Sequence, residues 1–130
     1  MALILDTSFI VDAEREAQRR PDGRAHDFLS SHPEEEFFIT FTVAGELACG
    51  TSAAARESWE RLLRPYALLM WNREISFLYG RIYRDLSSAG TLIGTNDLWI
   101  AATALRHKMA VVTDNMKEFS RVTGLQVVSY

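Results

Sequence analysis

The chain has 130 residues, of which 48% are hydrophobic and 24% charged, and its formal net charge is −3 at pH 7. This composition indicates one globular domain over residues 1–130 and excludes a disordered or collagen-like chain. The negative charge excludes general attraction to nucleic acid, so a polyanion would need a local basic patch or a metal ion. Cys49 is the only cysteine, and the sequence shows neither a signal peptide nor a membrane-spanning run, so we expect a cytoplasmic protein without disulfides.

Short apolar stretches alternate with helical patterns along the chain. In chain order the sequence predicts a strand at 2–5, a helix at 7–19, a short helix near 25–30, a strand at 37–40, helices from 42 to about 50 and from 52 toward 64, a strand-like run at 66–70, helices at 74–88 and 97–107, and strands at 110–113 and 126–129. Pro21 and Gly23 end the first helix, and Thr42 and Ser52 are the expected caps of two later ones. This alternation predicts an α/β fold, with a parallel sheet covered by helices on both faces.

Four acidic residues lie next to these apolar stretches, namely Asp6, Glu46, Asp97 and Asp114. Asp6 and Asp114 follow predicted strands, and the carboxyl ends of parallel strands form the ligand crevice of such sheets. Asp97 opens a helix, where we expect the positive end of the helix dipole to keep it ionised. Glu46 lies about one turn into its helix, and helical side chains lean back toward the N-terminus. The sequence therefore predicts that all four carboxylates meet in one crevice.

Clustered carboxylates repel one another unless a cation offsets their charge, and the sequence has no matching set of buried-looking Lys or Arg. An all-oxygen site selects a hard cation such as Mg²⁺, for which Mn²⁺ can substitute. The chemistry that follows is hydrolysis of a phosphodiester with the help of the metal. The alternative is that one or two of these acids are ordinary helix caps or surface charges.

Four segments carry a resemblance to a known family, and they are Leu5-Asp6-Thr7-Ser8, Thr42 to Leu47, Ile93 to Ala104 and Val112 to Leu125. The chain resembles the PIN-domain ribonucleases, and within them the VapC-type toxins of prokaryotic toxin–antitoxin pairs. The resemblance implies a PIN-like three-layer sandwich with a five-stranded parallel sheet between helices. It also implies a Mg²⁺-dependent endoribonuclease, a small antitoxin that holds it inactive, and a homodimer. The RNA substrate could be a tRNA or an rRNA.

The resemblance also assigns roles to individual residues. Asp6, Glu46, Asp97 and Asp114 form the catalytic cluster, and the positions of Asp6 and Asp97 are the most dependable metal ligands. The position of Asp114 is often Asn in the family. Thr7 and Thr113 match hydroxyl positions that orient the carboxylates.

Three further features leave alternatives open. Arg15, Arg19, Arg20 and Arg24 form a basic stretch that either follows RNA phosphates or is a solvated helix face. Trp59, Leu62, Leu63, Tyr66, Trp71, Phe77 and Tyr79 form either core or a surface for a partner, and we expect Trp99 to pack or to contact a second subunit. The rival functions are a PIN-fold module that binds RNA or protein without cutting, and a structure-specific DNA nuclease, for which this chain has too few acids and too little length.

Overall fold

One sheet of five parallel strands organises the computed structural model, which describes residues 2–19 and 23–130. The strands are β1 (Ala2–Leu5), β2 (Glu36–Thr40), β3 (Ala67–Leu69), β4 (Ala110–Val112) and β5 (Val127–Val128), and they lie in the order β3-β2-β1-β4-β5. The predicted α/β class and five-stranded parallel sheet are therefore confirmed. Arg20 of the basic stretch and Pro21 lie outside the described residues.

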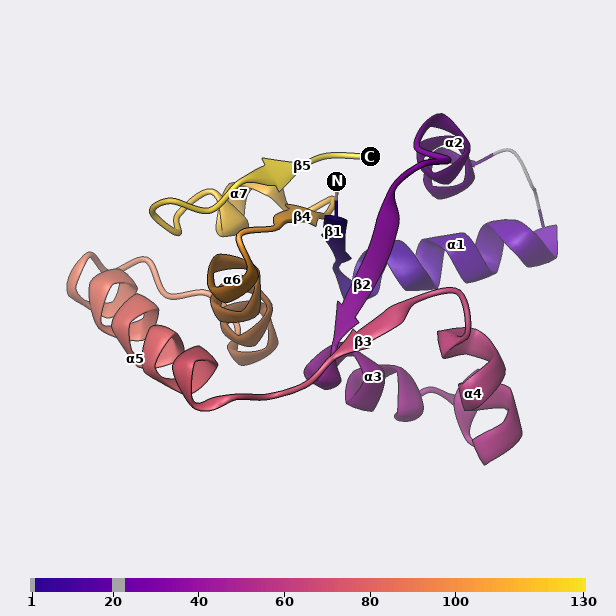
Figure 1. Cartoon of the computed structure of the whole chain (residues 1–130), viewed down its shortest axis with the longest axis horizontal. Helices are drawn as coiled ribbons and strands as arrows, with labels where there is room; N and C mark the ends of the chain where they lie inside the picture. Colours follow the sequence, from indigo (N-terminus) through magenta and orange to yellow (C-terminus); the bar gives the residue numbers. More distant parts are fainter. Residues whose placement is uncertain (1, 20–22) are drawn as a thin grey trace.

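Helices cover both faces of this sheet. They are α1 (Thr7–Arg19), α2 (Arg24–Ser31), α3 (Phe41–Ala48), α4 (Arg56–Leu63), α5 (Arg73–Ser88), α6 (Thr95–His107) and α7 (Met116–Phe119), with a short 3-10 turn η1 at Thr51–Ala53. Figure 1 shows α1 and α2 on one side of the strands and α5 and α6 on the other, which gives three layers. Among the described residues, no helix combines the length and apolar character needed to cross a membrane.

Two predicted helix caps are wrong. Thr40 rather than Thr42 caps α3, because Thr40 still has the extended backbone of β2 and its Oγ1 accepts a hydrogen bond from the Val43 N–H at 3.2 Å. Ser52 lies inside η1, and α4 begins after Ala55, whose side chain makes no capping bond. α7, a single helical turn that begins after Asn115, was not predicted.

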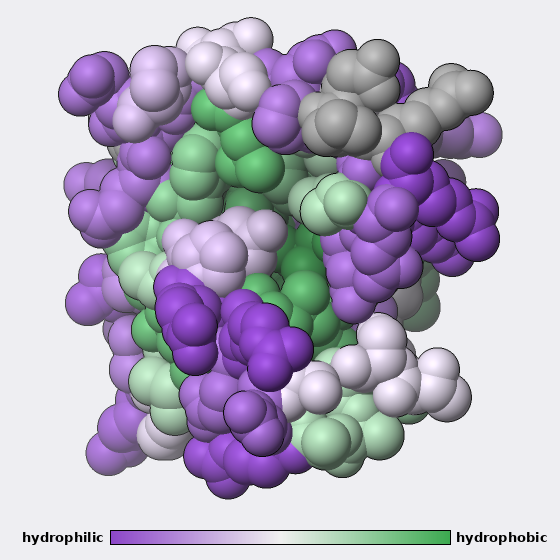
Figure 2. All heavy atoms as spheres, turned by 90° about the vertical axis from the view of Figure 1, so that its right-hand side faces the viewer, coloured by the Kyte–Doolittle hydropathy of each residue, from purple (hydrophilic) through white to green (hydrophobic). Residues whose placement is uncertain are grey.

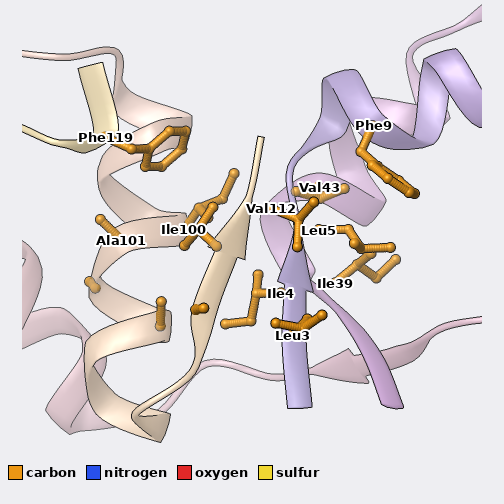
Figure 3. Close-up of a cluster of buried hydrophobic side chains, with 14 of the residues drawn as sticks. Leu3, Ile4, Leu5, Phe9, Ile39, Val43, Ile100, Ala101, Val112 and Phe119 are labelled. Carbon is orange, nitrogen blue, oxygen red and sulfur yellow. The ribbon is translucent and has the colours of Figure 1, made fainter. Parts of the chain in front are cut away.

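The core holds β1 at the centre of the molecule. Side chains of a strand point alternately to opposite faces, and Figure 3 shows Ile4 on the α6 side with Ile100 and Leu5 on the α1 side with Phe9. All four of these side chains are fully buried. Packing on both faces therefore fixes the position of the residue that follows β1.

The order of the strands creates a crevice beside β1. From β1 the chain adds β2 and β3 on one side, and it then crosses to the other side to add β4 and β5. Leu5 pairs with Val112, and the N–H of Asp6 donates to the Val112 carbonyl at 3.1 Å. Ligands of such sheets bind at the carboxyl ends of the strands where the order reverses. Asp6 and Thr113 follow the two strands at this switch point.

Candidate active site

Asp6 is a buried carboxylate with three hydrogen-bond donors. Its Oδ2 accepts from the Thr113 hydroxyl at 2.7 Å and from the Ser8 hydroxyl at 3.2 Å, and its Oδ1 accepts from the backbone N–H of Thr7 at 2.7 Å. Only 7% of its surface is exposed. Burial raises the pKa of Asp6, and the three donors oppose this rise because they stabilise the charged form. The donors hold the carboxylate in one orientation at the end of β1.

Asp97 lies in the first turn of α6 and has the opposite surroundings. Burial comes first among the causes that raise its pKa to about 7, followed by the charges of Asp6, Glu118 and Glu46. A side-chain hydrogen bond to Glu118 also raises this pKa, since two carboxyl groups must share a proton to form it. The position at the N-terminus of α6 therefore does not keep the pKa of Asp97 low, because burial and neighbouring negative charge raise it.

Glu118 is a member of this cluster that the sequence analysis missed. It lies on α7, is half-buried, and accepts a hydrogen bond at Oε2 from the Asn115 side-chain amide at 2.9 Å. An Asn followed three residues later by Glu resembles a capping box, and this spacing is the signal that could have predicted both α7 and the position of Glu118. The turn brings the carboxylate to Asp97.

Glu46 reaches the site from α3, and α6 holds it there. The Asn96 amide donates to Oε2 of Glu46 at 2.6 Å and to the Thr7 hydroxyl at 3.4 Å. Glu46 is itself exposed, so this bond is what restricts its carboxylate. Asn96 thus ties α6 to α3 and to the start of α1, and it places Glu46 close enough to act on Asp97.

The remaining predicted residues occupy different places. Thr113 is fully buried, and besides donating to Asp6 it accepts from the Asn115 N–H at 2.9 Å. Thr7 contacts Asn96 through its hydroxyl rather than a carboxylate. Asp114 is exposed and does not line the pocket that Asp6 and Asp97 line, although its charge is near enough to raise the pKa of Asp6.

The acidic pocket, as we call the cavity of about 570 Å³ at this edge, is lined by Asp6, Asp12, Arg15, Glu46, Asn96 and Asp97 among others. Within residues 2–19 and 23–130, no Lys or Arg forms an ion pair with the clustered carboxylates. In the same residues, no three Asp, Glu, His or Cys side chains lie as a ready-made metal-binding group. The donor chemistry still fits Mg²⁺, which takes one or two carboxylates and keeps several waters.

A second cavity, the apolar groove, opens between α1, α2 and α4. It measures about 770 Å³, and its apolar lining includes Ile10, Ala13, Leu29, Phe37, Leu62 and Tyr66. Figure 2 shows hydrophobic surface in a hollow on this side of the molecule, bordered by hydrophilic side chains. A groove of this kind suits a partner that offers an apolar side chain or an amphipathic helix.

The aromatic residues divide between core and surface. Trp99 stacks on Tyr79 with ring centroids 4.2 Å apart, and it meets Phe41 edge-on, so its predicted packing role is confirmed. Trp59, Leu62, Leu63, Tyr66 and Tyr79 are half-buried and pack against the core. Trp71 and Phe77 are 53% and 65% exposed, and Met70 beside Trp71 is 64% exposed. The exposed apolar surface therefore lies at the start of α5.

A family model and several known proteins match this chain. The model described as PIN domain matches residues 3–125. Ribonuclease VapC1 of Rickettsia felis is 32% identical over an alignment that covers 99% of this chain and 96% of that protein. Ribonuclease VapC1 of Haemophilus influenzae strain R2866 is also 32% identical, with 97% and 96% covered.

Solved structures show the same architecture. VapBC2 from Rickettsia felis, crystallised with a DNA fragment from its promoter, superposes with a TM-score of 0.85 and 25% identity, covering 100% of this chain and 99% of that one. VapBC-1 from nontypeable Haemophilus influenzae superposes with a TM-score of 0.77 and 29% identity, covering 99% and 98%. The likeness therefore extends over the whole sandwich.

Proposed function

This chain belongs to the PIN-domain family, and on that premise we propose that it is a Mg²⁺-dependent endoribonuclease, the toxin half of a toxin–antitoxin pair. The observation that carries the proposal is the position of Asp97, whose pKa is raised to about 7 by burial and by three other carboxylates. Among the described residues, no Lys or Arg forms an ion pair with these carboxylates, and Arg15 in the pocket lining is exposed. A divalent cation would offset the repulsion between the carboxylates, and its affinity for phosphate oxygens connects the pocket to RNA.

Each residue of the pocket has a task in this proposal. Asp6 and Asp97 hold the cation, which when bound supplies a Lewis acid that acidifies water and stabilises charge on the phosphate. Glu46 and Glu118 are both near enough to raise the pKa of Asp97, and they are the candidate acceptors of the proton that the attacking water would lose. Thr113 and Ser8 keep Asp6 aligned throughout, since both donate to its Oδ2. Asp114 remains a weaker candidate for the fourth acid, and Glu118 is our preferred one.

The test is cleavage of total cellular RNA by the purified protein in Mg²⁺ or Mn²⁺ and in EDTA, followed by mapping of the new ends. We expect 5′-phosphate and 3′-hydroxyl ends, because water rather than the RNA 2′-hydroxyl is the nucleophile. Asp97→Asn should abolish cleavage, and the exposed Asp85→Asn on α5 is the matched control that should retain it.

Two outcomes would contradict this mechanism. Cleavage that persists in EDTA, or ends that carry a cyclic phosphate, would show a ribonuclease that works without the carboxylates and a metal. RNA binding by the wild-type protein without any cleavage would instead favour the alternative of a non-catalytic PIN-fold module.

The apolar groove supports the second half of the proposal, an antitoxin partner. The solved neighbours named VapBC are the structural precedent, and the groove gives an apolar segment of such a partner somewhere to bind. Phe37→Asp, in the lining of the groove, should weaken the complex by more than tenfold, as loss of a buried apolar contact does. Phe77→Asp on α5 is the control. Co-purification of the antitoxin with each of the two variants measures the loss of binding.

A homodimer is the remaining part of the proposal. Exposed apolar side chains gather along β3 and α5, and they are Leu68, Met70, Trp71, Phe77 and Tyr83. β3 is also an edge strand of the sheet. A second copy would cover this surface. Light scattering should give twice the chain mass for the wild type and the chain mass for Phe77→Asp, and a wild-type monomer at micromolar concentration would refute the dimer.

A further inference from the structure

The acidic pocket and the apolar groove are joined by a third cavity along α1. This middle segment measures about 470 Å³, and it shares Thr7, Arg15 and Glu46 with the acidic pocket. At its other end it shares Gln18, Ser52 and Leu62 with the apolar groove. A channel therefore leads away from the carboxylates, with α1 as one wall and the stretch from α3 to α4 as the other.

Two arginines lie on the α1 wall of this channel. Arg15 lines both the acidic pocket and the middle segment, and Arg19 lines the middle segment alone. Both side chains are exposed, and neither forms an ion pair with any described residue. They are four residues apart on one helix, so they stand on the same face about 6 Å apart along its axis.

Two acids, Glu46 and Glu14, line the middle segment together with the arginines. Glu46 is at the acidic pocket and is held there by Asn96. Glu14 is near the apolar groove, where its charge contributes to the raised pKa of Tyr66, which burial does most to bring to about 12. Among the described residues, neither carboxylate forms an ion pair with Arg15 or Arg19, so both guanidinium groups can bind an external anion.

We propose that Arg15 and Arg19 form a phosphate-binding track that holds single-stranded RNA next to the cleaved bond. The inference rests on the proposed function, since it assumes that a phosphodiester occupies the acidic pocket. A strand with one phosphate at the carboxylates must leave along an open side of the pocket. This channel is the side that offers unpaired guanidinium groups, which bind phosphate with two parallel hydrogen bonds.

The overall charge of the protein makes such a track necessary. A chain with a net charge of −3 does not attract RNA as a whole, and the acidic pocket repels it. Local cations must therefore supply the attraction. An acidic peptide would be an alternative ligand for two arginines, but unlike RNA it has no group that a carboxylate–metal pocket would hold at the end of the channel.

The experiment measures binding rather than cleavage, so that it stays informative if the proposed function fails. All proteins carry Asp97→Asn, and a fluorescein-labelled uridine decamer is titrated by fluorescence anisotropy in EDTA from 0.05 to 1 M salt. Binding to single strands depends on salt with a slope of about 0.7 per phosphate contact. Arg15→Ala/Arg19→Ala should therefore reduce the slope by about 1.4, which corresponds to about 25-fold weaker binding at 0.1 M salt that disappears near 1 M.

Two matched variants make the result specific. Arg81→Ala/Arg84→Ala removes the same charge from the exposed face of α5, far from α1 in Figure 1, and it should leave the slope unchanged. Arg15→Lys/Arg19→Lys should keep most of the slope, because the slope counts charges. All variants should melt at the temperature of the Asp97→Asn parent, since these side chains are exposed. Equal slopes for the α1 and α5 alanine pairs, or an α1 pair that affects only binding of a protein partner, would overturn the proposal.

Discussion

The two sides of the acidic pocket differ in how they treat a negative charge. On the sheet side, Asp6 is buried but receives three hydrogen bonds from Thr7, Ser8 and Thr113. On the helix side, Asp97 is less buried than Asp6, and the charges that act on it most are those of other carboxylates. The sheet side fixes the carboxylate of Asp6 with hydrogen bonds, whereas on the helix side the negative charges near Asp97 have no ion-pair partner among the described residues.

The sheet side therefore holds a carboxylate in a fixed orientation, and the helix side holds one whose charge changes with pH. The side at the ends of β1 and β4 can hold one orientation because every donor belongs to the core or its border. On the side formed by α3, α6 and α7, burial and the charges of Asp6, Glu118 and Glu46 raise the pKa of Asp97 to about 7, so the charge of Asp97 depends on pH. In the proposed mechanism the fixed carboxylate of Asp6 would position a cation, and Asp97 would gain most from the cation's charge.

The largest expected effect is loss of RNA cleavage, which substitutions on both sides should cause. Only the substitution on the sheet side should also lower the free energy of unfolding. Asp6→Ala and Asp97→Asn should each reduce RNA cleavage by roughly 10³-fold, the scale of losing a group that stabilises the transition state. In EDTA, Asp6→Ala should lower the free energy of unfolding by about 1–3 kcal/mol, because the Thr113 hydroxyl is left without its acceptor. Asp97→Asn should be as stable as the wild type or more so.

Urea denaturation of both variants in EDTA measures this contrast. If Asp97→Asn were the less stable of the two, the described repulsion between Asp97 and the neighbouring carboxylates would be wrong.

The second prediction compares two candidates for the fourth acid. Glu118→Gln should reduce cleavage by about 10–100-fold, as losing a group next to a metal ligand does. Asp114→Asn should reduce it by less than about threefold, since this residue is exposed and does not line the pocket. Single-turnover cleavage of one RNA under identical conditions gives the ratio, and a larger loss for Asp114→Asn would restore that residue to the cluster.

The third prediction tests the rigidity of the sheet side. Thr113→Val removes the buried donor at 2.7 Å from Asp6, and it should cost about 1–3 kcal/mol of stability. Thr103→Val is the matched control, since Thr103 is equally buried but bonds only to the Trp99 carbonyl of its own helix. Thermal denaturation should show a clear loss for the first variant and little change for the second. Equal losses of stability would mean that the hydrogen bond to Asp6 contributes no more than the bond of Thr103 within its own helix.

The smallest effect concerns pH on the helix side. The pKa of Asp97 is about 7 in the folded protein and near 3.8 when unfolded, so the folded state binds more protons between these values. Stability in EDTA should therefore fall as pH rises from about 4 to 7, by roughly 1–2 kcal/mol after allowance for solvent screening. Asp97→Asn should show a flatter profile over this range. Identical profiles for the two proteins would contradict the raised pKa.

Features that depend on neighbouring residues in the sequence could be predicted. The apolar runs that become β1 and β4 end just before polar side chains, and parallel strands bring such ends together. Asp6 and Thr113 are an example, because their contact follows from strand order once the sheet is assumed. The long amphipathic helix α5 was equally visible, since its apolar stripe repeats at helical spacing over 16 residues.

Features that depend on tertiary surroundings could not be predicted from residue types. The ionisation of Asp97 is set by groups on three other elements, and the local signal, a helix N-terminus, indicates the opposite. The Asn96 bond to Glu46 joins positions 50 residues apart without any motif. Glu118 lies on a helix of four residues, too short to leave a periodic pattern.

The central position of β1 also determines when the pocket can form during synthesis. β1 is made first, yet its partner β4 begins at Ala110, and the donor that fixes Asp6 is Thr113. Contacts between residues so distant in sequence form late, and a ribosome adds roughly 5–20 residues per second. For several seconds the nascent chain therefore carries Asp6 without Thr113, Asp97 or Glu118. The acidic pocket can therefore form only after Glu118 has been synthesised.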